Sequence, residues 1–240
     1  MNKFAVIVAA CALAACGQPA APPASTTETA PTAIPTGSFI AYGDAPEFEF
    51  IADTSAQALE LRMNYETVAS APYSPPQPNG DGARIVSGDL TIDLTPGDCT
   101  ATGVRYPLRI TIQPLGREAV SGCAVERWDT RLIQLMPYID ACIAKSPETR
   151  WVTYAGDNGE HIIVRLRGGD SAERDCTVER DAPQDAVVQQ RSESLRVPGE
   201  SAALFVRGPG DNPGGECYDA PEVRAANGEV LGWMMDPMGC

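Results

Sequence analysis

The N-terminal 37 residues indicate the compartment in which the rest of this chain folds, because they carry the features of an export leader followed by a spacer. A single positive charge at Lys3 precedes an apolar run over residues 4–13. A charged start, an apolar stretch and small residues before a cleavage point are typical of a secretory signal peptide. We therefore expect residues 1–15 to be removed and the protein to fold outside the cytoplasm.

A cysteine directly follows the small residues, in the run Leu13-Ala14-Ala15-Cys16-Gly17. This run resembles the lipobox of bacterial lipoproteins. The resemblance implies that Cys16 carries three acyl chains, palmitate among them, and becomes the mature N-terminus. Gly17, where Asp would retain such a protein in the inner membrane, implies an outer-membrane anchor that faces the periplasm. An ordinary signal peptide with an incidental Cys16 is the alternative.

Residues 16–37 have the composition of a lipidated, disordered tether. They are rich in Pro, Ala and Thr, and Ile34 is the one large apolar residue among them. Such a segment buries too little surface to offset the entropy of ordering it. Its prolines favour an extended chain, so we expect the folded body to be held away from the membrane. No later segment reaches the 18 consecutive apolar residues of a membrane-spanning helix.

The charge balance excludes one class of partner. Of the 18 Lys and Arg residues, Lys3 leaves with the leader, so 17 basic residues face 32 acidic ones. Binding to nucleic acid depends mainly on Lys and Arg at phosphates, so we expect no nucleic-acid partner. Acidity fits either simple solubility or a cationic partner.

Six cysteines remain after Cys11 and Cys16, and an even number in an oxidising compartment indicates three disulfides. Fifteen pairings are open, and we choose the sequential one because each bridge then closes a local unit. The expected pairs are Cys99–Cys123, Cys142–Cys176 and Cys217–Cys240. A zinc site is the alternative, but the chain has no C-x-x-C motif and one histidine, so we expect neither metal nor cofactor.

Residues 38–128 show the pattern of short half-buried strands. Apolar and polar residues alternate over residues 47–50, 58–63, 90–94 and 106–112, and Pro- and Gly-rich turns separate the runs. Several short strands at this spacing predict a small antiparallel barrel or sandwich.

Residues 129–240 predict a smaller α+β domain, so the fold class we expect is α+β and predominantly β. An apolar stripe from Leu132 to Ile143 predicts an amphipathic helix, with an N-cap near residues 129–130 and an interruption at Pro137. Residues 182–191 predict a second short helix. Strand pairs are expected around residues 156–159 and around Asn227-Gly228, a strong hairpin signal.

A family resemblance rests on turn and cysteine motifs over about 90 residues. It is carried by residues 43–48 (a Gly-x-x-Pro-x-aromatic start), 90–92, 96–99, 105–107 and 121–124. Together they resemble a group of bacterial envelope lipoproteins that are distantly similar to the META/HslJ-type domain. The resemblance implies a small β-rich, disulfide-linked domain and no known reaction. The chain departs from the group at residues 100–103, where a Met-Ser-Asp-like run is expected.

No set of catalytic residues converges in the sequence. His161 lies on an expected strand without a recognisable nucleophile motif, and the Gly-rich run 208–215 lacks the Lys-Ser/Thr of a phosphate loop. Trp128, Trp151 and Trp233 fit a core better than a binding platform. We therefore expect a membrane-anchored, non-enzymatic binding, accessory or envelope-stress module. Its partner would be an envelope protein or a small ligand. Alternatives are a carboxylate-dependent envelope hydrolase and an inhibitor of a cationic hydrolase such as lysozyme.

Overall fold

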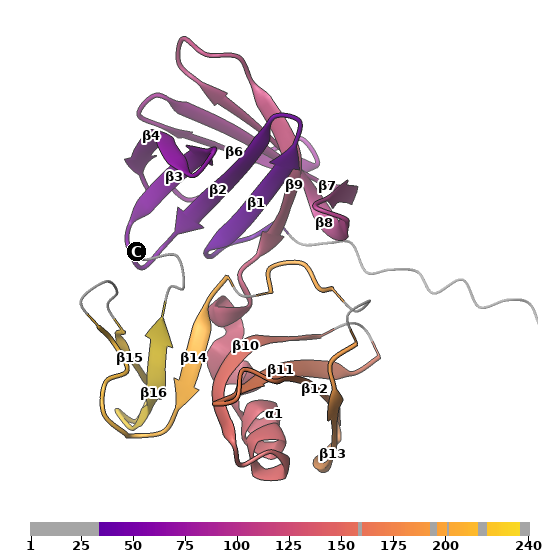
Figure 1. Cartoon of the computed structure of the whole chain (residues 1–240). Coiled ribbons are helices and arrows are strands. Elements are labelled where there is room, and N and C mark those ends of the chain that lie inside the picture. Colours follow the sequence, from indigo (N-terminus) through magenta and orange to yellow (C-terminus); the bar gives the residue numbers. More distant parts are fainter. Residues whose placement is uncertain (1–33, 158–159, 193–195, 201, 216–219, 236–240) are drawn as a thin grey trace, which may run out of the picture. The chain divides into compact units, whose positions relative to one another are not determined.

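Short alternating segments joined by tight turns pair most readily with their sequence neighbours. In the first sheet of this chain, such pairing gives two meanders. The computed structural model describes residues 34–157, 160–192, 196–200, 202–215 and 220–235. Within these residues the chain forms two antiparallel sheets and one α-helix, so the predominantly β, α+β fold class is confirmed. Figure 1 shows the arrangement of strands within each sheet.

The first sheet has nine strands in the order β4-β3-β2-β1-β9-β8-β7-β6-β5. The pairing of β1 with β9 joins two meanders into one sheet. The strands are β1 (Phe39–Asp44), β2 (Glu47–Asp53), β3 (Ala58–Met63), β4 (Glu66–Pro72), β5 (Gln77–Asn79), β6 (Gly82–Ser87), β7 (Leu90–Ala101), β8 (Val104–Pro114) and β9 (Val120–Glu126). The four alternating runs predicted from the sequence therefore lie on β2, β3, β7 and β8.

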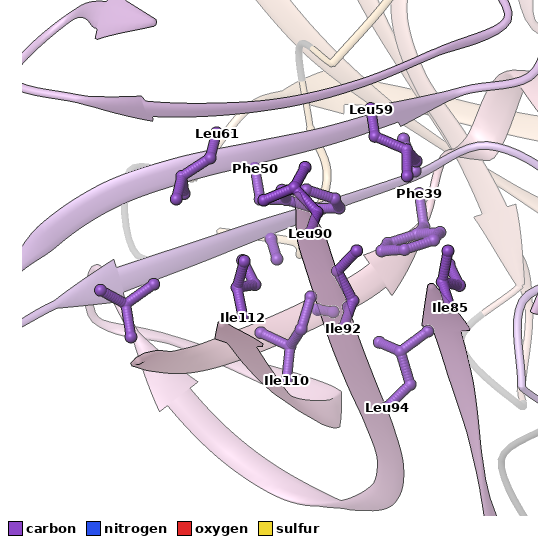
Figure 2. Close-up of a cluster of buried hydrophobic side chains, with 14 of the residues drawn as sticks. Phe39, Phe50, Leu59, Leu61, Ile85, Leu90, Ile92, Leu94, Ile110 and Ile112 are labelled. Atoms are coloured by element: carbon purple, nitrogen blue, oxygen red, sulfur yellow. The ribbon is translucent and has the colours of Figure 1, made fainter. Parts of the chain in front are cut away.

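This sheet curls so that its two meanders share one core. Figure 2 shows one row of apolar side chains from β1, β2 and β3 facing a second row from β6, β7 and β8. Every second residue points inward because successive side chains of a strand alternate between faces. The fully buried members include Phe39, Phe50, Leu59, Leu61, Ile85, Ile92, Leu94 and Ile112.

The second sheet has seven strands in the order β13-β12-β11-β10-β14-β16-β15. Its strands are β10 (Thr149–Asp157), β11 (Ile162–Gly168), β12 (Glu173–Glu179), β13 (Ala182–Gln190), β14 (Leu204–Arg207), β15 (Glu222–Arg224) and β16 (Val230–Met235). Both expected strand pairs form, β10 with β11 and β15 with β16.

One helix packs on the second sheet, and its boundary differs from the predicted one. The 3-10 turn η1 (Trp128–Arg131) precedes α1 (Leu132–Lys145), so Asp129 and Thr130 lie in η1 and do not cap α1. Thr130 Oγ1 donates to the Arg127 carbonyl instead. The helix continues through Pro137 without a new start. Its predicted apolar stripe packs into the core of the second sheet.

The second predicted helix is wrong, because residues 182–190 form strand β13. Val187 and Val188 pair with Thr177 and Cys176 of β12, and these tertiary contacts override the helix propensity of Ala and Gln. Pro183 is tolerated because β13 is an edge strand and Pro lies near its start.

Two of the three expected disulfides are present. Cys99 of β7 bonds Cys123 of β9, and Cys142 of α1 bonds Cys176 of β12. The remaining expected pair, Cys217–Cys240, lies outside the described residues, as does Cys16.

The described residues all belong to one compact unit. In the sequence, the strands of the first sheet precede residues 128–129 and those of the second sheet follow them. The division into two domains at that position stays a prediction. Among the described residues, no helix is long and apolar enough to cross a membrane.

Candidate functional site

Three polar side chains form a row across the outer face of the first sheet. The strand register places Tyr42 of β1 opposite Glu49 of β2, and Glu49 opposite Arg62 of β3. Directly opposed residues on one face bring their Cβ atoms to about 5 Å apart. The outer face therefore presents a phenol, a carboxylate and a guanidinium side by side.

Ion pairs hold the Arg62 guanidinium in place. Its Nη1 lies 3.6 Å from Glu49 Oε2, and its Nε and Nη2 donate to the two Glu60 oxygens at 3.0 and 2.9 Å. The hydrogen bonds from Arg62 hold the pKa of Glu60 below its usual value. A bidentate contact of this kind fixes both the plane and the direction of the guanidinium.

Tyr42 presents a phenol that stays protonated. Burial raises its pKa far above the ordinary value, and the negative charge of Glu49 and the neighbouring Tyr106 add to this. The Tyr42 and Tyr106 ring centroids lie 6.1 Å apart at an angle of 50°. Tyr42 is therefore a hydrogen-bonding group that keeps its proton over the whole physiological pH range.

The end of the β7–β8 hairpin, residues 99–106, folds back over the outer face; we call it the arm. Its side chains Ala101, Val104 and Tyr106 form a small buried cluster with Cys123, next to Tyr42 and Val125. The Cys99–Cys123 disulfide bonds the arm to β9. At its tip, the Asp44 carboxylate accepts the Thr102 N–H at 2.9 and 3.1 Å. The arm is thus fixed at both ends.

The turn between β3 and β4 presents an exposed aromatic ring. Asn64 and Tyr65, its two central residues, have φ values of 50° and 66°. Positive φ at both positions suits Asn and Gly, so Tyr is an unfavourable choice there. The Tyr65 side chain is 88% exposed, which is the largest exposed fraction among the large hydrophobic side chains that the structure describes.

Two hollows lie beside the arm, and both are lined by Gly43. The first has a volume of about 240 Å³ and is lined by the row Tyr42, Glu49 and Arg62 together with Glu47, Asn64, Tyr65 and Thr102. The second has a volume of about 440 Å³ and is lined by Asp44, Arg109 and several hydroxyls, which are those of Thr95, Thr100, Thr111 and Ser121. Ligand pockets commonly measure roughly 300–1,000 Å³, so the second hollow is of ligand size and the first is slightly smaller.

Glycine is required where the two hollows meet. A Cβ on Gly43 would lie 2.2 Å from Phe48 Cε1, and a Cβ on Gly122 would lie 2.2 Å from the Tyr42 carbonyl oxygen. The ring of Phe48 fits only because these side chains are missing. Of the Gly-x-x-Pro-x-aromatic residues that carry the family resemblance, Gly43 and Phe48 line the hollows and Pro46 does not, whereas Thr100 and Thr102 of the departing run line them.

Other residues singled out in the sequence lie elsewhere. His161 Nδ1 is 3.1 Å from Glu179 Oε1 at one end of the second sheet. Trp128 is buried in the core, whereas the Trp151 ring carries the Arg150 guanidinium 5.0 Å from its centroid. Trp233 Nε1 donates to the Gly210 carbonyl. These residues have separate contacts and do not make a common site.

The hydrolase alternative requires two carboxyl groups in a cleft, one of them with a raised pKa. Glu47 and Glu49 share the outer face of β2 and line the first hollow. Burial raises the pKa of Glu126, but Glu126 lines neither hollow. In the part of the chain that the structure describes, no group of three or more His, Cys, Asp or Glu side chains is placed to hold a metal ion.

No sequence motif predicts that Arg62, Asn64, Tyr65 and the cross-strand row form a site. One signal was available, because the alternating run that ends at Met63 is followed by an Asn and then, two residues on, by polar Glu66. A two-residue turn starting with Asn is a hairpin signal, although Tyr in place of Gly weakens it. The row itself depends on strand register between β1, β2 and β3, which no local motif specifies.

Comparison of the chain with protein-family models, curated proteins and solved structures finds no match. The resemblance to META/HslJ-like envelope lipoproteins therefore stays a prediction, and the site has to be interpreted from its own chemistry.

Proposed function

We propose that this chain is a lipid-anchored envelope protein that binds a partner or ligand non-covalently in the two hollows beside the arm. The observation that supports this most is that the row of Tyr42, Glu49 and Arg62 and the exposed Tyr65 line the same hollow. Polar groups fixed in orientation beside an exposed aromatic ring are typical of recognition sites.

The rigidity of the site also supports binding. The disulfide and the Asp44–Thr102 hydrogen bonds fix the arm, and ion pairs fix Arg62. A preorganised surface loses little conformational entropy when a ligand binds, so its contacts contribute more fully to affinity.

Backbone strain at Tyr65 also supports the binding proposal. A non-glycine residue with positive φ is energetically unfavourable, and such residues concentrate at functional sites. A fully exposed Tyr gains no burial on folding that would offset this strain. Its ring is available to a partner, and that role would account for the residue.

The binding proposal is tested by capture from solubilised envelope with the full-length chain as bait. Arg62→Ala and Tyr65→Ala should each abolish capture of a saturable component. The matched controls are Arg84→Ala, which removes another ion-paired arginine of the same sheet, and Leu115→Ala, which removes another exposed apolar residue. Equal capture by all four variants would refute the proposal, and release of a cleaved product would indicate a hydrolase instead.

The anchor is tested separately, because it rests on the leader sequence alone. Cys16→Ser should move the protein from the membrane fraction to the soluble periplasmic fraction and abolish incorporation of labelled palmitate. Cys11→Ser, a change within the leader, is the control and should alter neither result. Membrane retention of the Cys16→Ser protein would show that the lipobox resemblance is misleading.

A further inference from the structure

We infer that the two hollows together bind an oligosaccharide, with sugar rings on both sides of Gly43. This rests on the proposed function and adds the chemical class of the ligand.

The local charge is close to neutral although the chain as a whole is acidic. The charged residues that line the hollows are three acids and two arginines, namely Asp44, Glu47, Glu49, Arg62 and Arg109. Glu49 shares Arg62 with Glu60, and Asp44 accepts a backbone N–H of the arm. A site for a basic protein would need an uncompensated negative field. A neutral ligand rich in hydrogen-bonding groups suits this surface better.

The side chains have the chemistry that sugars require. A pyranose ring offers an apolar C–H face, which stacks on an aromatic ring, and hydroxyls that both donate and accept hydrogen bonds. The exposed Tyr65 ring supplies the aromatic face. Glu47 and Asn64 beside it supply planar groups that can bind neighbouring hydroxyls in pairs.

The second hollow lies farther along the same row of the sheet, on the other side of the arm, because the arm buries Cys123 between them. Tyr42 of β1 lies opposite Cys123 of β9, Cys123 lies opposite Arg109 of β8, and Arg109 lies opposite Thr95 of β7. Arg109 and the Thr95 hydroxyl therefore extend the polar row beyond the disulfide. Gly43 lines both hollows, so we expect a chain of linked sugars to pass the arm tip at Asp44 and Thr102 and contact both, whereas a single sugar fills only one.

The experiment measures glycan binding by the full-length chain in detergent, first on a broad glycan array that includes envelope polysaccharide fractions. Calorimetry then compares the best tetrasaccharide with its monosaccharide. We expect at least tenfold tighter binding of the tetrasaccharide, with little change between 50 and 500 mM salt, because neutral ligands are not screened. Tyr65→Ala and Arg109→Ala should each weaken binding at least tenfold, and Leu115→Ala and Arg84→Ala should not. Circular dichroism confirms folding of each variant.

Different failures have different meanings. If no glycan binds, yet Tyr65-dependent capture from envelope survives enzymatic removal of glycans, the proposed function holds and the saccharide inference is wrong. Salt-sensitive binding to lysozyme, used as a basic-protein probe, would have the same meaning. If Tyr65 and Arg62 affect no capture at all, both proposals fail. Equal affinity for the mono- and tetrasaccharide would overturn the use of both hollows.

Discussion

Arg165 of β11 donates from Nε to Asp175 Oδ1 of β12 at 2.8 Å, and both side chains are almost completely buried. The two residues lie directly opposite each other in the second sheet. Glu200 also contacts Arg165 and joins it to Arg191. An ion pair this deep in the protein stabilises it only while every charge keeps its partner.

Removal of one partner of this pair should be strongly destabilising. Asp175→Asn removes the directly opposed carboxylate from the buried Arg165 charge, and we expect a loss of about 3 kcal/mol in the free energy of unfolding. Urea denaturation followed by circular dichroism measures it. Replacement of both residues, as Arg165→Met with Asp175→Leu, should cost less than the single change, because no charge is then left unpaired.

The control for this prediction is the pair Arg84–Asp93, which is also an Arg–Asp pair across two strands but is exposed. Asp93→Asn should change the free energy of unfolding by less than about 1 kcal/mol, since solvent screens exposed ion pairs. Similar losses for Asp175→Asn and Asp93→Asn would mean that burial does not set the strength of the Arg165 network.

The Cys142–Cys176 disulfide should stabilise the second sheet with α1 on it. It links residues 34 positions apart, and chain-entropy arguments assign such a bridge about 3 to 4 kcal/mol. The double variant Cys142→Ala with Cys176→Ala should lose roughly that amount in urea denaturation under oxidising conditions. Peptide mapping without reduction supplies the covalent check, and a Cys142-containing peptide bonded to any other cysteine would contradict this pairing.

The sequence predicts four of the nine strands of the first sheet, β2, β3, β7 and β8, because alternation with period two marks strands that have one face in a core. Among the strands it misses is β1, where Phe39 and Ala41 face the shared core but Ile40 on the other face is buried as well. A strand that is covered on both sides loses its alternation. The cover is a tertiary feature, so no pattern within residues 39–44 predicts it.

The second sheet shows the limit of propensity. Ala and Gln favour a helix over residues 182–191, yet this segment completes the edge of a sheet by pairing with β12. The candidate site shows the limit of motifs in the same way. Gly43 and Phe48 are visible as a motif, but their neighbours Arg62 and Tyr65 join them only through strand register.

Acid should weaken the first sheet through Glu60. Arg62 holds the pKa of Glu60 below its ordinary value of 4.5, so the folded state favours the carboxylate. The stabilising contribution is fully present above about pH 4.5 and is lost as the pH falls through the lower pKa of the folded state. Glu60→Gln should lower stability at pH 7, and this loss should shrink as the pH falls below 4.5. A loss that stays the same as the pH falls would show that the ion pair with Arg62 is not the cause.

Glu126 should show the opposite dependence. Burial raises its pKa, so the folded state favours the protonated acid and the charge at neutral pH is destabilising. Glu126→Gln should therefore increase the free energy of unfolding at pH 7. The gain should vanish as the pH falls below the ordinary value of 4.5, where both states are protonated. Urea denaturation at pH 7 and pH 3.5 tests this, and a loss of stability at pH 7 would contradict it.

Substitution of Tyr65 should have opposite effects on stability and on binding. Glycine adopts a φ of 66° without strain, so Tyr65→Gly should raise the free energy of unfolding by about 1 kcal/mol, even after the added freedom of the unfolded chain is counted. The same change removes the exposed ring and should abolish capture of the envelope component. Gln57→Gly is the matched control, since Gln57 has a φ of 54° and lines neither hollow. It should gain stability and keep full binding. If Tyr65→Gly instead loses stability, then the ring makes contacts within the protein that outweigh its strain, and Tyr65 has a structural role.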